Sequence, residues 1–335
     1  MAERKSETAE GGHHVGETLL TVKDLTVKYI TDYSTIHAVN GVSFSVKKGE
    51  TLGLVGETGA GKTTIAKSIL RVLPDPPAKV FDGEIYLYEE NLFKLKMRAM
   101  RAVRGKKISM IFQDPMTSLN PIERVGDQIA EAIGLHYKIN KIEQVERSKE
   151  MLEKVGIPRD RYSEYPHQFS GGMKQRVVIA MALACYPDLL LADEPTTALD
   201  VTIQAQVLEL MWSLKEELGT SMIMITHDLG IVAEACDNVA IVYAGEIVEY
   251  GTVEDVFDRR AHPYTSGLFL SLPGANKDAK RLSPIKGLMP DPSNLPTGCK
   301  FHVRCPGATE RCANEIPENK RLSETHYVKC FMGGE

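Results

Sequence analysis

The sequence predicts an α/β fold with a P-loop core, an antiparallel β subdomain, a helical subdomain and a small Cys-rich C-terminal extension. Four observations lead to this prediction. A Gly-rich loop lies between an apolar strand and a helix, and further apolar strands ending in polar residues alternate with helices. A pair of amphipathic helices interrupts that alternation, and four of the cysteines gather near the C-terminus.

The phosphate-binding loop is predicted at residues 56–64, where the spacing is G-x-x-x-x-G-K-T. An apolar strand (51–55) precedes it, and this context disfavours a chance Gly-rich turn. Backbone N–H groups of such a loop converge on one anion, and the helix N-terminus adds positive potential. We expect Lys62 to reach the β- and γ-phosphates and Thr63 to bind Mg²⁺. The residues expected to contact nucleotide are Gly56, Glu57, Thr58, Gly59, Ala60, Gly61, Lys62, Thr63 and Thr64.

An antiparallel sheet is expected ahead of this loop, with strands at 19–29 and 42–46 and a turn at Lys23-Asp24, and residues 83–88 are expected to form another strand. Tyr29 ends the first strand. An aromatic side chain there could stack on an adenine ring, and a plain core or edge tyrosine is the alternative.

Polar residues end the apolar strands of the core. Gln113, the pair Asp193-Glu194 and His227 each follow such a strand. Ligands of open α/β sheets bind at the carboxyl ends of the strands. Buried acids are costly without a role, and the upstream phosphate loop disfavours acids that merely end a strand at the surface. We therefore expect Asp193 to hold Mg²⁺ with Thr63, Glu194 to polarise the attacking water, and His227 to contact the γ-phosphate.

A helical subdomain is predicted between these strands, with Gly156 ending its second helix and Ser170 capping a third that runs to about residue 185. Ser170, Gly171 and Gly172 form a weak anion-site signal of their own, since their N–H groups lie at a helix N-terminus. The apolar positions expected to face inward on the first two helices are Val125, Ile129, Ile133, Leu135, Val145, Met151, Leu152 and Val155.

The end of the core domain and the extension have different patterns. A helix follows Asp200, and a closing hairpin is expected at 238–250 with Ala244-Gly245 at its turn. A short helix starts near residue 262, before a Pro- and Gly-rich loop at 273–298.

Composition sets limits on the partners. The chain has 335 residues, is 43% hydrophobic and carries a net charge of −5, so we expect one large domain with an appendage and no nucleic-acid partner. No apolar run reaches the roughly 18 residues that a membrane span needs. Residues 1–18 are polar and predict a disordered leader, with His13-His14 as candidate tag residues, rather than a secretory signal. These features favour the cytoplasm.

Taken together, these motifs resemble the nucleotide-binding subunit of an ABC transporter over roughly residues 19–258, with a helical insert at about 115–186. The resemblance implies ATP hydrolysis, with Tyr29 as the adenine-stacking aromatic and Gln113 as the Q-loop glutamine and a further Mg²⁺ ligand. It makes Asp200 the D-loop aspartate and His227 the switch histidine. The usual Leu-Ser-Gly-Gly-Gln signature reads Phe-Ser-Gly-Gly-Met at 169–173. The serine and both glycines are kept, so we expect function to survive.

Segments 113–121 and 165–173 and the extension at 259–335 are similar to the oligopeptide/dipeptide importer subgroup, which includes nickel importers. This resemblance implies ATP-powered peptide import from the cytoplasmic face of the cell membrane. It also implies two integral membrane permease subunits and, indirectly, an extracytoplasmic substrate-binding protein. A second ATP-binding subunit, either a copy or a paralogue, would pack head to tail and complete the site with its Ser170, Gly171 and Gly172. A nickel-importer ATPase and a soluble non-transport ABC ATPase remain alternatives.

The late cysteines have the spacing C-x5-C-x6-C-x17-C. In a reducing compartment a sulfur site for metal is favoured over disulfides. Structural zinc sites usually have shorter knuckles, and one cysteine is followed by proline, so a [4Fe–4S] cluster is expected, with Zn²⁺ or no metal as alternatives. His302 or His326 could replace one ligand. The expected ligands are Cys299, Cys305, Cys312 and Cys330.

Overall fold

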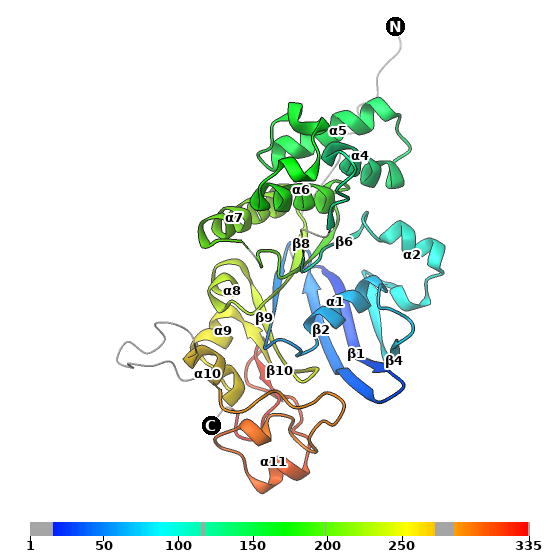
Figure 1. Ribbon diagram of the computed structural model, residues 1–335. Coiled ribbons are helices and arrows are strands. Elements are labelled where there is room, and N and C mark those ends of the chain that lie inside the picture. The colour runs from blue at the N-terminus through cyan, green and yellow to red at the C-terminus, as the bar shows by residue number, and fades with distance from the viewer. Residues whose placement is uncertain (1–15, 115–117, 198, 272–284, 334–335) are drawn as a thin grey trace.

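The computed structural model describes residues 16–114, 118–197, 199–271 and 285–333 (Figure 1). The predicted leader therefore lies almost entirely outside the described residues. So do the start of the helical insert at 115–117 and much of the Pro- and Gly-rich loop. Within the described ranges, no helix is both long and apolar enough to cross a membrane.

The main sheet is a mostly parallel sheet of eight strands among the described residues, in the order β11-β12-β10-β9-β3-β8-β7-β6. β3 lies inside it, and all of its residues are buried, as a strand covered on both faces requires. Parallel pairing joins β9 to β3, β3 to β8, β8 to β7 and β7 to β6. The strands are β3 (Thr51–Val55), β6 (Ile108–Ile111), β7 (Leu189–Asp193), β8 (Ser221–Thr226), β9 (Asn238–Tyr243), β10 (Glu246–Thr252), β11 (Lys320–Arg321) and β12 (Tyr327–Val328).

A second, antiparallel sheet has the order β2-β1-β4-β5 and confirms the predicted β subdomain. The expected turn at Lys23-Asp24 is wrong, because β1 continues through it with a register shift between Val22 and Leu25. Asp24 has φ 47°, and its N–H donates to Ser43 Oγ of the neighbouring strand at 2.8 Å, so the irregularity is a bulge held by its partner. The strands are β1 (Thr18–Ile30), β2 (Thr35–Lys47), β4 (Ala78–Leu87) and β5 (Glu90–Asn91).

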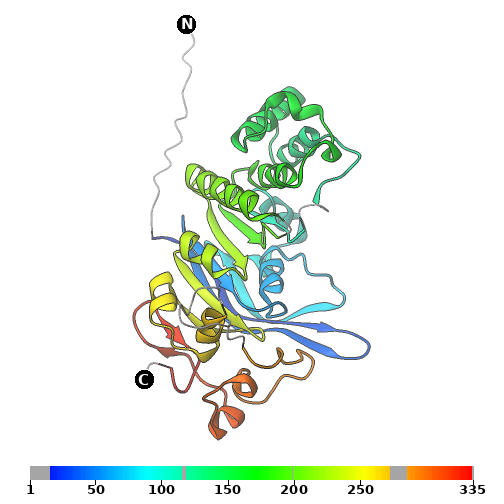
Figure 2. The same cartoon turned by 60° about the vertical axis from the view of Figure 1, so that its left-hand side comes forward.

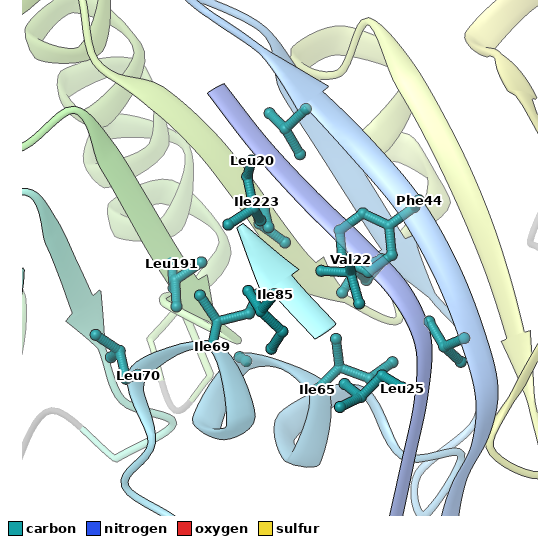
Figure 3. Close-up of a cluster of buried hydrophobic side chains, with 14 of the residues drawn as sticks. Leu20, Val22, Leu25, Phe44, Ile65, Ile69, Leu70, Ile85, Leu191 and Ile223 are labelled. Atoms are coloured by element: carbon teal, nitrogen blue, oxygen red, sulfur yellow. The ribbon is translucent and has the colours of Figure 1, made fainter. Parts of the chain in front are cut away.

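The hydrophobic core lies on both faces of the main sheet. On one face, α1 (Lys62–Leu70) packs between the two sheets, and Ile65 and Ile69 point into a cluster with Val22, Phe44 and Leu191 (Figure 3). On the other face, α6 and α7 cover β7 and β8. The remaining helices near this core are α2 (Met97–Val103), α6 (Gly171–Leu183), α7 (Val201–Leu218) and α8 (Leu229–Ala235), with the 3-10 turn η1 (Leu92–Lys94).

The helical subdomain projects away from the main sheet (Figures 1 and 2). Val125, Ile129 and Ile133 are buried as predicted, but Leu135 is 74% exposed. Leu135 follows Ile133 by two residues, which turns it about 200° around the helix and away from the buried face. The elements are α4 (Val125–His136), α5 (Lys141–Lys154), η2 (Arg159–Ser163) and η3 (Pro166–Gln168).

The C-terminal extension packs against the end of the main sheet and adds β11 and β12 to it. Tyr327 of β12 pairs with Tyr250 of β10, and their rings stack with centroids 5.0 Å apart. Phe301 enters a core cluster with Tyr243 of β9 and Tyr264 of α10, so the extension shares a core with the sheet. After α9 (Val253–Asp258), which ends the core domain, the extension contains α10 (Pro263–Leu270), η4 (His302–Arg304) and α11 (Glu310–Asn314).

Candidate functional site

The phosphate-binding loop follows β3 and is packed too closely for side chains at two of its glycines. A Cβ at Gly56 would lie 2.1 Å from the Val242 carbonyl oxygen of β9. One at Gly61, where φ is +105°, would lie 2.3 Å from the Ala38 carbonyl oxygen of β2. Only glycine fits at both positions, and its absence of a side chain lets the backbone turn into α1. The close packing holds the loop between two strands from different sheets.

Lys62 is the first residue of α1, and its side chain folds back over the loop. Its Nζ donates to the carbonyl oxygens of Gly56 at 2.7 Å and Glu57 at 3.0 Å. Burial lowers the pKa of Lys62, against the opposing charges of Glu194, Asp193 and Glu57. The ammonium is thus held where a triphosphate could exchange with these carbonyl partners.

The predicted Mg²⁺ pair lies side by side. Thr63 Oγ1 donates to Asp193 Oδ1 at 3.2 Å, and Asp193 is the buried last residue of β7. Burial raises the pKa of Asp193, the hydrogen bond from Thr63 opposes that rise, and the nearby Glu194 charge adds to it. A hydroxyl and a carboxylate at one point form the oxygen donor set that Mg²⁺ prefers, so these residues fit the ion.

Glu194 is the centre of a polar cluster. Its Oε2 accepts from Gln113 Nε2 at 3.3 Å and from Thr197 Oγ1 at 3.1 Å, and its Oε1 lies 3.4 Å from His227 Nδ1. The structure therefore brings together the strand-end residues that the sequence suggested. Burial alone would raise the pKa of Glu194, but these hydrogen bonds and the His227 charge lower it below its ordinary value. A carboxylate that is ionised and partly covered can orient and polarise a water molecule.

Tyr29 lies at the end of β1 beside the first turn of α1. Its hydroxyl is 3.2 Å from Thr64 Oγ1, and its side chain is half-buried. The ring is therefore next to the loop, where a nucleotide base could reach it. Its stacking role stays a prediction.

The Ser-Gly-Gly segment begins α6, away from the loop. Ser170 caps the helix by accepting from Met173 N at 3.4 Å, and Asp200 caps α7 through Ile203 N at 3.0 Å. In the described ranges, no hydrogen bond or ion pair joins residues 170–172 to residues 56–64. Figure 1 shows α6 with the helical subdomain and α1 beneath it. One copy of the chain thus leaves Ser170, Gly171 and Gly172 apart from its own loop.

The four late cysteines gather in the extension, where Cys299 N donates to the Cys312 carbonyl oxygen at 2.8 Å. Burial raises the pKa of Cys299 to about 11 and also raises that of Cys305, and mutual thiolate repulsion adds to both rises. Across the described residues, however, no group of three or more His, Cys, Asp or Glu side chains is arranged to hold a metal ion. The two histidines suggested as substitutes have other partners. His302 Nδ1 lies 2.8 Å from the Cys299 carbonyl oxygen, and His326 Nε2 lies 2.9 Å from Glu249.

Sequence reasoning missed the side chains that hold this site from outside its motifs. Thr197 is one of them, since its hydroxyl donates to Glu194. Tyr264 and Arg304 both reach Glu57 of the loop from the extension. The short helix predicted near residue 262 indicates that Tyr264 lies on an ordered element. Neither spacing nor periodicity indicates which group its hydroxyl contacts.

Two family descriptions match separate parts of the chain. Residues 39–197 match "ABC transporter", and residues 248–312 match "Oligopeptide/dipeptide transporter, C-terminal region". The first match contains the loop and the acids that end β7. The second contains α10 and most of the cysteine segment.

Whole-length relatives and solved structures are also similar. The dipeptide transport ATP-binding protein DppD of Bacillus subtilis is 49% identical over 94% of this chain and 95% of its own length. The oligopeptide transport ATP-binding protein OppD of Salmonella typhimurium is 46% identical over 97% of both. The ATP-binding cassette MJ0796, solved as a dimer in a post-hydrolysis state with ADP and Pi, is 27% identical with a TM-score of 0.63, covering 70% of this chain and 99% of that one.

Proposed function

Since this chain belongs to the ABC transporter family, among the ATP-binding subunits of peptide transporters, we propose that it binds and hydrolyses ATP to drive the import of dipeptides or oligopeptides. The observation that carries the chemistry is the placement of Glu194, hydrogen-bonded to Gln113 and beside His227, directly after the Thr63–Asp193 pair. Phosphoryl transfer to water requires that the phosphate charge is neutralised and that a water molecule is positioned. The residues that could meet these two requirements lie next to each other.

Each residue has a distinct role in this proposal. Lys62 Nζ leaves the carbonyl oxygens of the loop and binds the β- and γ-phosphates, and Tyr29 stacks on the adenine. Glu194 orients the attacking water and accepts its proton, while His227 contacts the γ-phosphate. Thr63 and Asp193, with Gln113, would hold Mg²⁺, which when bound offsets charge on the phosphates.

A second ATP-binding subunit completes the site. The N–H groups at the start of α6 face no phosphate loop in their own copy, so Ser170, Gly171 and Gly172 would bind the γ-phosphate held by the partner's loop. Asp200, which caps α7, would lie at the same junction. ATP then bridges the two subunits, and hydrolysis removes the bridging charge and lets them separate.

The remaining partners follow from the transport function. We place the chain at the cytoplasmic face of the membrane, bound to two integral permease subunits and served indirectly by an extracytoplasmic substrate-binding protein. The helical insert and Gln113 would pass the closing and opening of the ATP site to the permeases. The relatives named for peptide transport favour this reading over the nickel alternative.

Transport by the complete assembly tests this function. The chain, co-purified with its membrane subunits, is placed in lipid vesicles and supplied with the substrate-binding protein and with labelled dipeptide, oligopeptide or nickel. We expect ATP-dependent uptake of peptide, lost in Lys62→Ala and kept in Lys94→Ala, whose side chain is 76% exposed. Peptide uptake that needs neither ATP nor Lys62 would contradict the function, and uptake of nickel alone would reassign the cargo.

The four cysteines remain candidates for a metal site. Their spacing and their gathering support a [4Fe–4S] cluster, with Zn²⁺ as the alternative, although the described side chains do not form a ligand set. Anaerobic purification followed by iron, sulfide and zinc analysis tests the assignment. A chain with four-iron stoichiometry supports the cluster, and one with neither metal rejects both.

A further inference from the structure

The C-terminal extension and the phosphate-binding loop meet at Glu57. Arg304 Nη1 donates to Glu57 Oε2 at 2.7 Å, and Nη2 donates to Oε1 at 3.0 Å, which gives two parallel bonds. The Arg304 side chain is 5% exposed and that of Glu57 is 28% exposed. Bidentate pairs of this kind are among the strongest and most directional in proteins.

Tyr264 of α10 makes a second contact from the same side. Its hydroxyl accepts a hydrogen bond from Glu57 N at 2.9 Å. The Glu57 carbonyl oxygen accepts from Lys62 Nζ at 3.0 Å. The extension therefore contacts both the backbone and the side chain of Glu57, and Glu57 in turn binds the lysine of the loop, Lys62.

The two contacts have rigid support. The Tyr264 ring lies 4.6 Å from that of Tyr243 and 5.4 Å from that of Phe301, and the Arg304 guanidinium lies 5.8 Å from the Tyr243 ring centroid. Arg304 also ends the turn η4, where its N–H donates to the Phe301 carbonyl oxygen at 2.9 Å. Close packing of these rings restricts the rotamer of Tyr264, and burial restricts the side chain of Arg304.

The charge of Glu57 makes this contact relevant to nucleotide binding. A carboxylate in a phosphate-binding loop repels a triphosphate, and that repulsion is strong where solvent screening is reduced. Arg304 engages both oxygens of that carboxylate and offsets its charge. Removing Arg304 alone would leave an unpaired acid beside the phosphates.

We propose that Arg304 and Tyr264 are positioning residues for ATP binding, which set the conformation of the phosphate-binding loop and neutralise Glu57 from the C-terminal extension. The proposal rests on the proposed function, because it takes the loop to bind ATP. A purely structural docking contact would behave differently. Its loss would lower the stability of the fold without a selective effect on nucleotide affinity. It makes the extension part of the ATP site.

A comparison of single and double variants of the full chain tests the proposal, with Mg-ATP affinity measured by calorimetry and KM and kcat measured for hydrolysis. We expect Arg304→Gln to raise Kd and KM about tenfold with less than about twofold change in kcat. The double variant Arg304→Gln/Glu57→Gln should recover to within about threefold of wild type, because the unpaired acid is gone. Arg311→Gln is the control, since it removes an exposed ion pair with Glu315 in the same extension and should leave Kd unchanged.

Equal weakening in the single and double variants, or an unchanged Kd in Arg304→Gln, would overturn the proposal. If Arg304→Gln does not fold, Tyr264→Phe keeps the aromatic packing and removes only the hydroxyl. It should raise Kd about threefold, and an unchanged Kd would overturn the role of the extension. A wild-type chain that does not bind Mg-ATP would refute the proposed function itself, whereas unaffected variants of an ATP-binding chain refute only the positioning role.

Discussion

Among individual residues, Glu194 has the setting that matters most for chemistry. It is the non-glycine residue that follows β7 with φ 46°, a left-handed conformation that aims its side chain at Gln113 and His227. The donors around it favour the ionised carboxylate. A group that must accept a proton from water is most effective when it is ionised at the working pH.

Thr197 provides a test of that setting. Thr197→Val removes a hydrogen bond that lowers the pKa of Glu194, so that pKa rises. The acid limb of the kcat–pH profile should then move to higher pH, with turnover above neutrality little changed. Thr31→Val, in an exposed loop, is the control. An acid limb that stays in place would mean that Glu194 does not control it.

The sequence could predict the residues at the strand ends because parallel strands share a carboxyl edge. Asp193, Glu194, Gln113 and His227 meet for that reason. Thr197, Tyr264 and Arg304 could not be identified, since each reaches the site through packing between segments far apart in sequence. The roles of the identified residues stay predictions that mutants must test.

Among the helices and strands, α10 contains a buried histidine that links stability to pH. His262 caps this helix by accepting from Tyr264 N through Nδ1 at 3.0 Å, and burial lowers its pKa to about 3. In the unfolded chain the pKa is near the model-peptide value of about 6.5. As the pH falls below about 6.5, His262 therefore binds a proton in the unfolded state but stays neutral in the folded state.

The resulting stability is fully present above pH of about 6.5 and is lost as the pH falls toward the folded pKa. At pH 5 the loss should be about 2 kcal/mol. His262→Asn keeps a capping acceptor without the titration, so its free energy of unfolding should fall by about that much less between pH 7 and pH 5. Chemical denaturation at both values measures this, with the exposed His167→Asn as control. Identical pH dependence in wild type and His262→Asn would contradict the argument.

Hydrophobic periodicity predicts most of the helices and strands. The prediction is wrong where a local sequence pattern is compatible with two structures. The predicted hairpin turn at Ala244-Gly245 is present, and both residues have positive φ, as a type I′ turn requires. The polar Lys23-Asp24 pair predicts a turn from its residue types, whereas β1 has a bulge there. Leu135 was placed inward from its hydrophobicity alone, although its angle on the helix points outward.

In the whole molecule, the extension completes the main sheet and the loop rather than following them as an appendage. Its strand β12 pairs with β10, and Phe301 joins the core that contains Tyr243. Sequence patterns carry little information about such contacts, because short strands pair across long separations.

The composite site predicts complementation between two defective copies. Lys62→Ala disables the loop and Ser170→Arg disables the segment offered to a partner, so each alone should hydrolyse almost no ATP. Head-to-tail pairing of one with the other leaves one site with an intact loop and an intact Ser-Gly-Gly segment. A mixture of the two should regain part of the wild-type rate. No regain would contradict a site shared between two copies of this chain.

The most direct test of the central claim is ATP hydrolysis by the full chain with Glu194 replaced by glutamine. Glu194→Gln keeps the shape of the side chain and its contact with His227, but removes the base. The account predicts that Mg-ATP binds with unchanged affinity while kcat falls by at least about 100-fold, the usual contribution of a positioned base. Turnover close to wild type in Glu194→Gln would contradict it.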